Sequence, residues 1–224
     1  MYIIEVAIIT FVSLLPISNP FAAVPLYLSL TRGHTREWSQ QQALKASFYM
    51  AGILLVFLWS GALIIEFFGI SIPAIRIAGG IIIMRVGFSM MNPNDNPEAI
   101  TDEAKEESKK KTDIAFTPLA MPSLSGPGSI SVVVSMAAGS DDILGYFGVS
   151  LGILAVVTVA WLALRSAPWI SKVLGVTGLD ALTRIMGFLL ICIAFQFVID
   201  GVGGYLTSDS FLQPIMHGLS LIHE

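Results

Sequence analysis

Residues 16–25 read Pro-Ile-Ser-Asn-Pro-Phe-Ala-Ala-Val-Pro, and residues 118–127 read Pro-Leu-Ala-Met-Pro-Ser-Leu-Ser-Gly-Pro. Both stretches place prolines at their first, fifth and tenth positions, and they lie 102 residues apart. A proline inside a helix removes a hydrogen-bond donor and clashes with the carbonyl group four residues earlier. Each stretch therefore predicts a break in the helix that contains it.

Both proline stretches lie inside long uncharged segments. Four segments of 20 or more residues contain no charged side chain: 6–31, 46–65, 114–140 and 143–164. Two further segments are apolar apart from one or two charges: 67–91, with Arg76 and Arg85, and 185–208, with Asp200. A helix that crosses a bilayer needs about 20 apolar residues. The sequence therefore predicts six spans, with the first and fourth broken.

The composition agrees with a membrane protein. Of the 224 residues, 54% are hydrophobic and 12% are charged, and the mean hydropathy is +0.78. Soluble domains carry about 25% charged residues. A soluble helical core would also need amphipathic stripes, whereas these segments are apolar on all sides. We therefore predict an all-α integral membrane protein with six transmembrane helices.

A second pair of motifs supports an internal repeat. Arg76-Ile-Ala-Gly79 in the third predicted span matches Arg184-Ile-Met-Gly187 in the sixth, at an offset of 108 residues. Because each repeat holds three spans, an odd number, the second repeat must be inverted relative to the first. This 3+3 inverted-topology repeat divides the chain into a first repeat, a charged cytoplasmic linker, a second repeat and a C-terminal tail: 1–91, 92–113, 114–208 and 209–224.

Basic residues gather on one side of the predicted spans. Ten of the twelve lie in or beside the connections between spans one and two, three and four, and five and six: Arg32, Arg36, Lys45, Lys105, Lys109, Lys110, Lys111, Arg165, Lys172 and Arg184. Loops rich in Lys and Arg stay on the cytoplasmic side of a membrane. We therefore predict a multi-pass protein of the inner (cell) membrane with both termini in the periplasm.

The two breaks predict a substrate-binding site. Pro25 and Pro127 suit the first residue of a resumed half-helix, where the missing N–H group costs nothing. The free N–H groups and the positive dipole end of such a half-helix favour an anion such as a carboxylate. The predicted substrate-binding residues at the breaks are Asn19, Pro20, Pro25, Ser123, Ser125, Gly126 and Gly128. The alternative is that the prolines only kink two packed helices.

Charged residues inside a span are costly and mark functional sites by default. Arg76 and Arg184 lie near the starts of their spans, where each either contacts the substrate or extends to the lipid headgroups. Asp200 lies one helical turn beyond Gln196. These two residues together are candidates for a proton or cation site, although hydration at the membrane boundary also explains Asp200. Asn19, with the carbonyl groups freed at the breaks, is a separate candidate for the coupling ion. Apart from a coupling proton or sodium ion, we predict no cofactor and no metal site.

One sequence pattern bears on whether the protein is an enzyme. The stretch Gly148-Val-Ser-Leu-Gly152 matches the nucleophile-elbow pattern, but it lies in an apolar span and has no histidine partner there. The histidines lie outside the spans: His34, His217 and His223. We therefore predict that the protein is not an enzyme, and that the two glycines form a small-residue packing face. Cys192 in the sixth span predicts a buried structural thiol.

At these residues the chain resembles the MarC family of six-span inner-membrane proteins. The matching stretches extend over most of the chain: 18–25, 68–73, 76–80, 118–128 and 183–187. The resemblance implies transport of small neutral amino acids such as glycine and alanine. Many family members have a glycine two residues after the Asn-Pro pair, where this chain has Ala22. This departure stiffens the first break and bears on the size of the substrate.

Inverted repeats build many secondary transporters, because they form two access states around one central site. We therefore predict an ion-coupled transporter of small neutral solutes, in the neutral amino acid class, that works by alternating access. Its partners are the solute and the lipid bilayer, with no nucleic acid, and a homo-oligomer is compatible with so small a bundle. The alternatives are a non-transporting structural or assembly protein, and an exporter of another small solute.

Overall fold

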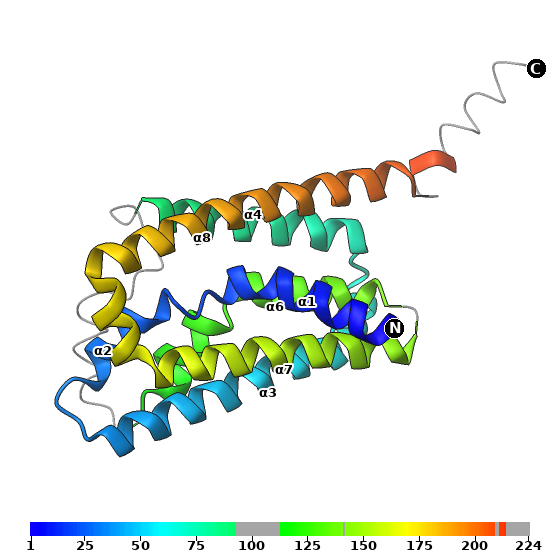
Figure 1. Ribbon diagram of the computed structural model, residues 1–224. Helices are drawn as coiled ribbons and strands as arrows, with labels where there is room; N and C mark the ends of the chain where they lie inside the picture. The colour runs from blue at the N-terminus through cyan, green and yellow to red at the C-terminus, as the bar shows by residue number, and fades with distance from the viewer. Residues whose placement is uncertain (93–112, 141, 209–210, 214–224) are drawn as a thin grey trace, which may run out of the picture.

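The structure is a computed structural model that describes residues 1–92, 113–140, 142–208 and 211–213. These residues form an elongated bundle of helices, and they contain no strand (Figure 1). The predicted linker and C-terminal tail fall almost entirely outside the described residues, so the statements about them stay predictions.

Single helices account for four of the six predicted spans, and two bent pairs of helices are candidates for the other two. In chain order they are α1 (Tyr2–Ser18), α2 (Ala23–Thr31), α3 (Arg36–Phe68), α4 (Ile72–Met91), η2 (Ala115–Leu124), α6 (Pro127–Ala138), α7 (Ile143–Arg165) and α8 (Ala167–Leu206). Parts of α3 and α8, and the whole of α4 and α7, are long and apolar enough to cross a membrane. The pairs α1–α2 and η2–α6 are bent by 56° and 64°, and each pair adds one span if it crosses as a unit. An all-α membrane protein with four to six candidate spans is thus confirmed.

Local signals set the ends of α3 and α4. The Oγ1 atom of Thr35 accepts a hydrogen bond of 3.3 Å from the Trp38 N–H group, and this cap starts α3. Gly69, with a φ of 62°, ends the same helix in the left-handed conformation that glycine adopts readily. Ser71 then caps α4 by accepting from the Ala74 N–H group at 3.4 Å. The turn between the two spans is therefore short.

The last span begins earlier than predicted. Gly175, with a φ of 63° and a ψ of −176°, interrupts α8, and the membrane-crossing part runs over Thr177–Leu206. The predicted start at residue 185 was too late because Asp180 and Arg184 interrupt the apolar run but not the helix. Arg184 therefore lies about 10 Å inside this span, at 1.5 Å per residue.

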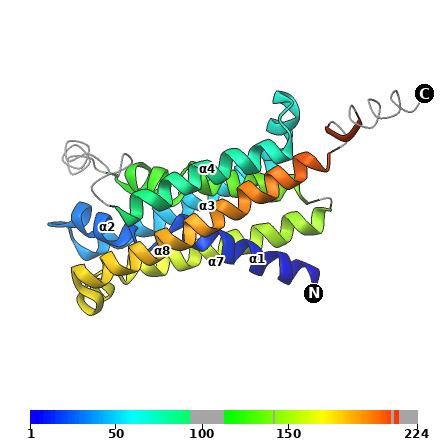
Figure 2. The same ribbon diagram turned by 90° about the horizontal axis from the view of Figure 1, so that it is seen from above.

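The third and sixth spans, α4 and α8, lie side by side and antiparallel (Figures 1 and 2). A Cβ atom added to Gly87 would lie 2.9 Å from the carbonyl oxygen of Gly187, and one added to Gly187 would lie 2.9 Å from that of Gly87. Both distances are shorter than a normal van der Waals contact of about 3.5–4.0 Å. Only glycine permits so close a crossing at these positions, as is common between membrane helices.

The first and fifth spans use the predicted packing face. A Cβ atom on Gly148 would lie 3.0 Å from the carbonyl oxygen of Ile3, and one on Gly152 would lie 2.7 Å from that of Ala7. The two glycines thus bring α7 against α1, which confirms the small-residue face. Their place in the nucleophile-elbow pattern is accounted for by packing alone.

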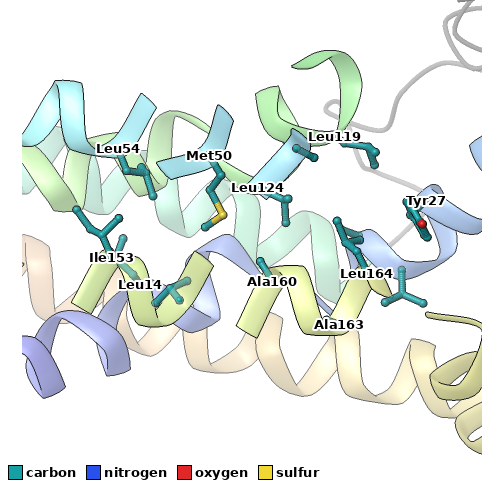
Figure 3. Packing of buried hydrophobic residues seen from close by; sticks show 14 of the residues in the cluster. Leu14, Tyr27, Met50, Leu54, Leu119, Leu124, Ile153, Ala160, Ala163 and Leu164 are labelled. Atoms are coloured by element: carbon teal, nitrogen blue, oxygen red, sulfur yellow. The ribbon is translucent and has the colours of Figure 1, made fainter. Parts of the chain in front are cut away.

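The apolar core lies between the unbroken helices α3 and α7 and the two broken spans (Figure 3). Leu14 of α1 and Leu124 of η2 are fully buried beside Met50 and Leu54 of α3 and Ile153 of α7. In a bilayer such packing stabilises through many small dispersion contacts rather than through removal of water. Both broken spans are therefore held against the same rigid pair of helices.

The prediction of a buried thiol was wrong. Cys192 is exposed on the surface of α8. The helix turns Leu190 and Ala194 inward instead, and both are fully buried. Residues two apart on a helix point about 200° apart, so Cys192 points away from the face that Leu190 and Ala194 share.

The N-terminus and the C-terminal end of α8 lie at the same end of the bundle (Figure 1). The connections from α2 to α3 and from α7 to α8 lie at the opposite end. These connections carry Arg32, Arg36 and Arg165, so basic residues gather at the end away from the termini. Which end faces the periplasm stays a prediction.

Candidate functional site

The first break is compact and satisfies its own polar groups. Helix α1 ends at Ser18, and Asn19 follows in the left-handed conformation, with a φ of 30° and a ψ of 67°. The Oδ1 atom of Asn19 accepts a hydrogen bond of 3.2 Å from the Ala22 N–H group, and Nδ2 lies 3.7 Å from the Sδ atom of Met90. Asn19 is only 6% exposed. Its side chain therefore holds the break together.

The second break is longer and less regular. Thr117 and Met121 have extended backbone, with φ and ψ of −124° and 122°, and of −127° and 124°. At the offset of 102 residues, Met121 corresponds to Asn19. Residues Ser125 and Gly126 then separate η2 from α6, which begins at Pro127. The fourth span thus leaves the helical path at several points.

The two breaks meet inside the bundle. The Oγ atoms of Ser18 and Ser129 lie 3.4 Å apart, although the residues are 111 apart in sequence, and both are buried. A Cβ atom on Gly128 would lie 3.3 Å from Ile17 and 3.4 Å from Ile83. The end of α1 and the start of α6 are therefore in contact, and α4 lies beside them.

The Ser125 hydroxyl lies at the second break. Its Oγ atom is fully buried and has no hydrogen-bond partner among the described residues. A buried polar group without a partner costs free energy of roughly 1–3 kcal/mol. Most buried polar side chains in native structures have a hydrogen-bond partner, so this hydroxyl is a candidate to bind a solute.

The other residues predicted at the breaks differ in their placement. Pro127 is the first residue of α6, as predicted, but Pro25 is the third residue of α2. The helix starts before Pro25 because the Val24 N–H group already donates to Phe21 at 3.2 Å. The side chains of Pro25 and Pro127 are exposed on the bundle surface, whereas Pro20 is buried and Ser123 is half-buried.

The charges at the start of the fourth span are paired. Asp113 accepts hydrogen bonds from the Ala115 N–H group at 2.9 Å and from Lys45 Nζ at 3.0 Å. Burial raises the pKa of the Asp113 carboxyl, but these two hydrogen bonds and the Lys45 charge outweigh burial and hold the pKa below its usual value. The Ile114 N–H group donates to Gln42 at 3.0 Å. Lys45 and Gln42 of α3 therefore bind the start of the fourth span.

A cavity of about 480 Å³ lies on the side of the breaks that faces the termini. Polar residues from four helices line it, among them Thr10 and Ser13 of α1, Arg76 of α4, Ser135 of α6, and Gln196 and Asp200 of α8. The volume lies within the range of about 300–1,000 Å³ that is usual for ligand pockets. Sequence reasoning missed Thr10, Ser13 and Ser135, since small hydroxyl residues in an apolar span are common and give no signal of their own.

The structure brings together some predicted residues and separates others. Arg76, Gln196 and Asp200 line this one cavity, but Arg184 is exposed on the bundle surface. Asn19 contacts Met90, which lies 14 residues beyond Arg76 on α4, or about 21 Å at 1.5 Å per residue. Asn19 therefore lies apart from Arg76, and the coupling-ion roles of Asn19, Gln196 and Asp200 stay predictions.

The breaks and most of the cavity fall within the part of the chain that matches known proteins. A family model described as "MarC family integral membrane protein" matches residues 4–206. The inner membrane protein MarC of Citrobacter koseri is 39% identical over 201 residues, which cover 85% of this chain and 91% of that protein. Inner membrane proteins MarC of two Escherichia coli strains, O1:K1 and K12, are 39% identical over 202 residues, with the same coverage. No solved structure matches the chain.

Proposed function

The chain belongs to the MarC family of integral membrane proteins, and from that premise we propose that it is a secondary transporter of small neutral solutes. The proposed solutes are neutral amino acids of the glycine and alanine class, and transport is coupled to a proton or sodium gradient. The protein moves its solute without chemical change, and it uses no cofactor beyond the coupling ion.

The packing of the spans supports an inverted repeat. Span one packs against span five through α1 and α7, and span four packs against span two through η2, α6 and α3. Exchanging the two halves of the chain converts the first of these pairs into the second. Spans three and six, α4 and α8, pack against each other, and exchanging the two halves converts this pair into itself. A pseudo-two-fold axis in the membrane plane produces this pattern, and such an axis is common in secondary transporters.

The meeting of the two breaks is the observation that carries the proposal. Ser18 and Ser129 touch at 3.4 Å, and the unpartnered hydroxyl of Ser125 lies four residues before Ser129. The first N–H groups of α6 have no partner within their helix, and they carry the positive end of its dipole. A solute carboxylate at this point satisfies both the hydroxyl and the N–H groups.

The glycines at the second break suit a small solute. Gly126 and Gly128 carry no side chain at the start of α6, and Gly128 already lies close to Ile17 and Ile83. A solute that reaches the backbone here has little room for a side chain of its own. The carbonyl groups freed by the breaks are proposed to hold the coupling cation, as in other transporters with discontinuous helices.

Flux of labelled glycine, alanine and serine into proteoliposomes tests the proposal. The full-length protein is reconstituted, and a proton or a sodium gradient is imposed in separate experiments. We expect uptake above that of empty liposomes for the smallest solutes, and an increase with one of the two gradients. Export from preloaded liposomes is measured in parallel, since a transporter with a reversible cycle works in both directions.

The result that would contradict the proposal is a lack of flux for all three solutes in either direction. Circular dichroism and protease accessibility must first show that the protein is folded and inserted. A folded protein without flux, which retains a stoichiometric protein partner in mild detergent, indicates the structural or assembly role instead. Gradient-independent flux of a different solute indicates an exporter of another class.

A further inference from the structure

The cavity near the termini contains side chains of both charges. Arg76 and Asp200 line it from α4 and α8, and Thr10 and Ser13 line it from α1. Charged side chains within spans are costly, and most of them face a cavity or the bundle interior. A lining with one cation, one anion and small hydroxyl groups fits a ligand that itself carries both charges.

Arg76 is held in place with part of its hydrogen-bonding capacity unused. Its Nε atom donates to the Ser135 hydroxyl at 3.4 Å, which ties it to α6. The guanidinium group has five N–H donors, and no other hydrogen bond of Arg76 occurs among the described residues. The remaining donors can meet a carboxylate with two parallel hydrogen bonds.

Asp200 is positioned in a similar way. The Nε2 atom of Gln196 donates to its Oδ1 atom at 2.8 Å, one turn earlier on the same helix. In the described part of the chain the only ion pair joins Lys45 to Asp113, so Arg76 and Asp200 do not pair with each other. A guanidinium and a carboxylate therefore face one cavity, each with a neutral partner and each without a counter-ion.

This cavity is separate from the breaks. Ser13 lines it, and Ile17, one turn further along α1, contacts the start of α6 at Gly128. Ser18 and Ser129 touch directly beyond that point. The contact between α1 and α6 thus lies between the cavity and the breaks, while Tyr2 and Asp200 place the other side of the cavity near the termini.

We propose that this cavity is a binding subsite for the zwitterionic form of a small amino acid, in which Arg76 binds the carboxylate and Asp200 binds the ammonium group. The subsite receives the solute before it passes to the breaks. The inference rests on the proposed transport function and adds to it a second site. It also reassigns Gln196 and Asp200 from a coupling ion to the solute, with Gln196 and Ser135 as positioning residues.

The first test is equilibrium binding of labelled alanine to the full-length protein in nanodiscs, at fixed pH and sodium concentration. Arg76→Gln and Asp200→Asn should each weaken binding about tenfold or more, since each removes hydrogen bonds between charged groups. Arg85→Gln, on the same helix but outside the cavity, and Asp142→Asn, at the same end of the bundle, should leave binding unchanged.

Competition by single-charge analogues identifies which group binds which charge. Propionate has the carboxylate alone, and ethylamine has the ammonium group alone. Arg76→Gln should abolish competition by propionate and retain that by ethylamine, and Asp200→Asn should do the reverse. Equal loss of both in either variant indicates a structural defect rather than a contact, and it overturns the assignment.

A second readout does not depend on the charge variants. A Ser13→Cys, Cys192→Ser double variant is labelled from the outside with a membrane-impermeant thiol reagent. Alanine should slow labelling, whereas propanol, which has neither charge, should not. Labelling that alanine leaves unchanged would overturn the subsite, even if transport itself is observed.

The outcomes separate the subsite from the transport function. Wild-type flux that Arg76→Gln and Asp200→Asn leave intact overturns the subsite and leaves the proposed function standing. Loss of ion dependence in Asp200→Asn with unchanged alanine affinity also overturns it, because Asp200 then serves the coupling ion. An absence of flux in the wild-type protein, with alanine binding that needs both charged residues, supports the subsite and contradicts transport.

Discussion

The two broken spans carry the same spacing of prolines but break in different ways. In the first span a regular helix runs to Ser18, and Asn19 closes a short turn with its own side chain. In the fourth span the backbone is extended at Thr117 and Met121, and the buried Ser125 hydroxyl is left without a partner in the described structure. Prolines at equivalent positions thus produced one break that the Asn19 side chain closes and one break that leaves a buried hydroxyl without a partner in the described structure.

The difference shows where a ligand can act. Asn19 uses its amide oxygen and one of its amide N–H groups to hold the first break together. The second break offers an unpartnered hydroxyl and the start of α6, both without a competing side chain. We infer that the first break mainly shapes the site and that the second break mainly binds the solute.

The largest effect is expected from a side chain at the start of α6. A Cβ atom on Gly126 would lie 2.9 Å from the carbonyl oxygen of Pro122, a backbone atom that cannot move freely. Gly126→Leu should therefore reduce flux to the level of empty liposomes while the protein still inserts. Gly203→Leu is the matched control, since nothing lies within 4 Å of its Cβ position. Equal flux in both variants would show that the second break does not form the site.

A smaller effect is expected from the first break, and two substitutions sharpen the comparison. Asn19→Ala removes the cap and leaves a left-handed backbone that costs other residues about 1–2 kcal/mol. Asn19→Gly removes the same side chain, but glycine adopts the left-handed backbone conformation without this cost. If the first break only shapes the site, Asn19→Gly should restore most of the flux and thermal stability lost in Asn19→Ala. A glycine variant as inactive as the alanine variant, but stable, would show that the amide binds the solute.

The Ser125 hydroxyl should affect affinity without harming stability. Ser125→Ala removes a buried group that lacks a partner, so the free energy of unfolding should stay the same or rise by about 1 kcal/mol. Alanine binding should weaken about tenfold, as expected for one hydrogen bond to a carboxylate. Thermal unfolding and equilibrium binding measure the two effects separately. A clear loss of stability would mean that the hydroxyl already has a structural partner.

The smallest effect is expected from the ion pair between Asp113 and Lys45 at the start of the fourth span. The pKa of Asp113 is lowered in the folded protein, so its stabilising contribution is present above the unfolded value of about 3.9 and is lost as the pH falls through the lower folded value. Asp113 and Lys45 are 44% and 51% exposed, so Asp113→Asn should cost less than about 1 kcal/mol near pH 7. Thermal unfolding of the two proteins should converge below about pH 4. A difference that persists at acid pH would assign the effect to packing.

Several predictions from the sequence depend on local chemistry, and these were confirmed. Long uncharged runs placed the spans, and proline placed the bends, because both effects act within a few neighbouring residues. Gly148 and Gly152 likewise predicted a packing face. One prediction that failed needed knowledge of distant contacts: Cys192 turned outward. Two predicted starts were also wrong, since α2 begins before Pro25 and the last span begins before residue 185.

The sequence by itself determined an all-helical membrane protein with two interrupted spans, since hydropathy and proline chemistry need no partner segment. Only the tertiary structure decided which side chains face the cavity and which hydroxyl is left unpaired. A helix turns about 100° per residue, so a side chain's direction depends on how its helix is rotated against its neighbours. Close crossings at Gly87 and Gly187 hold α4 against α8, and Arg76 and Asp200 of these two helices line one cavity.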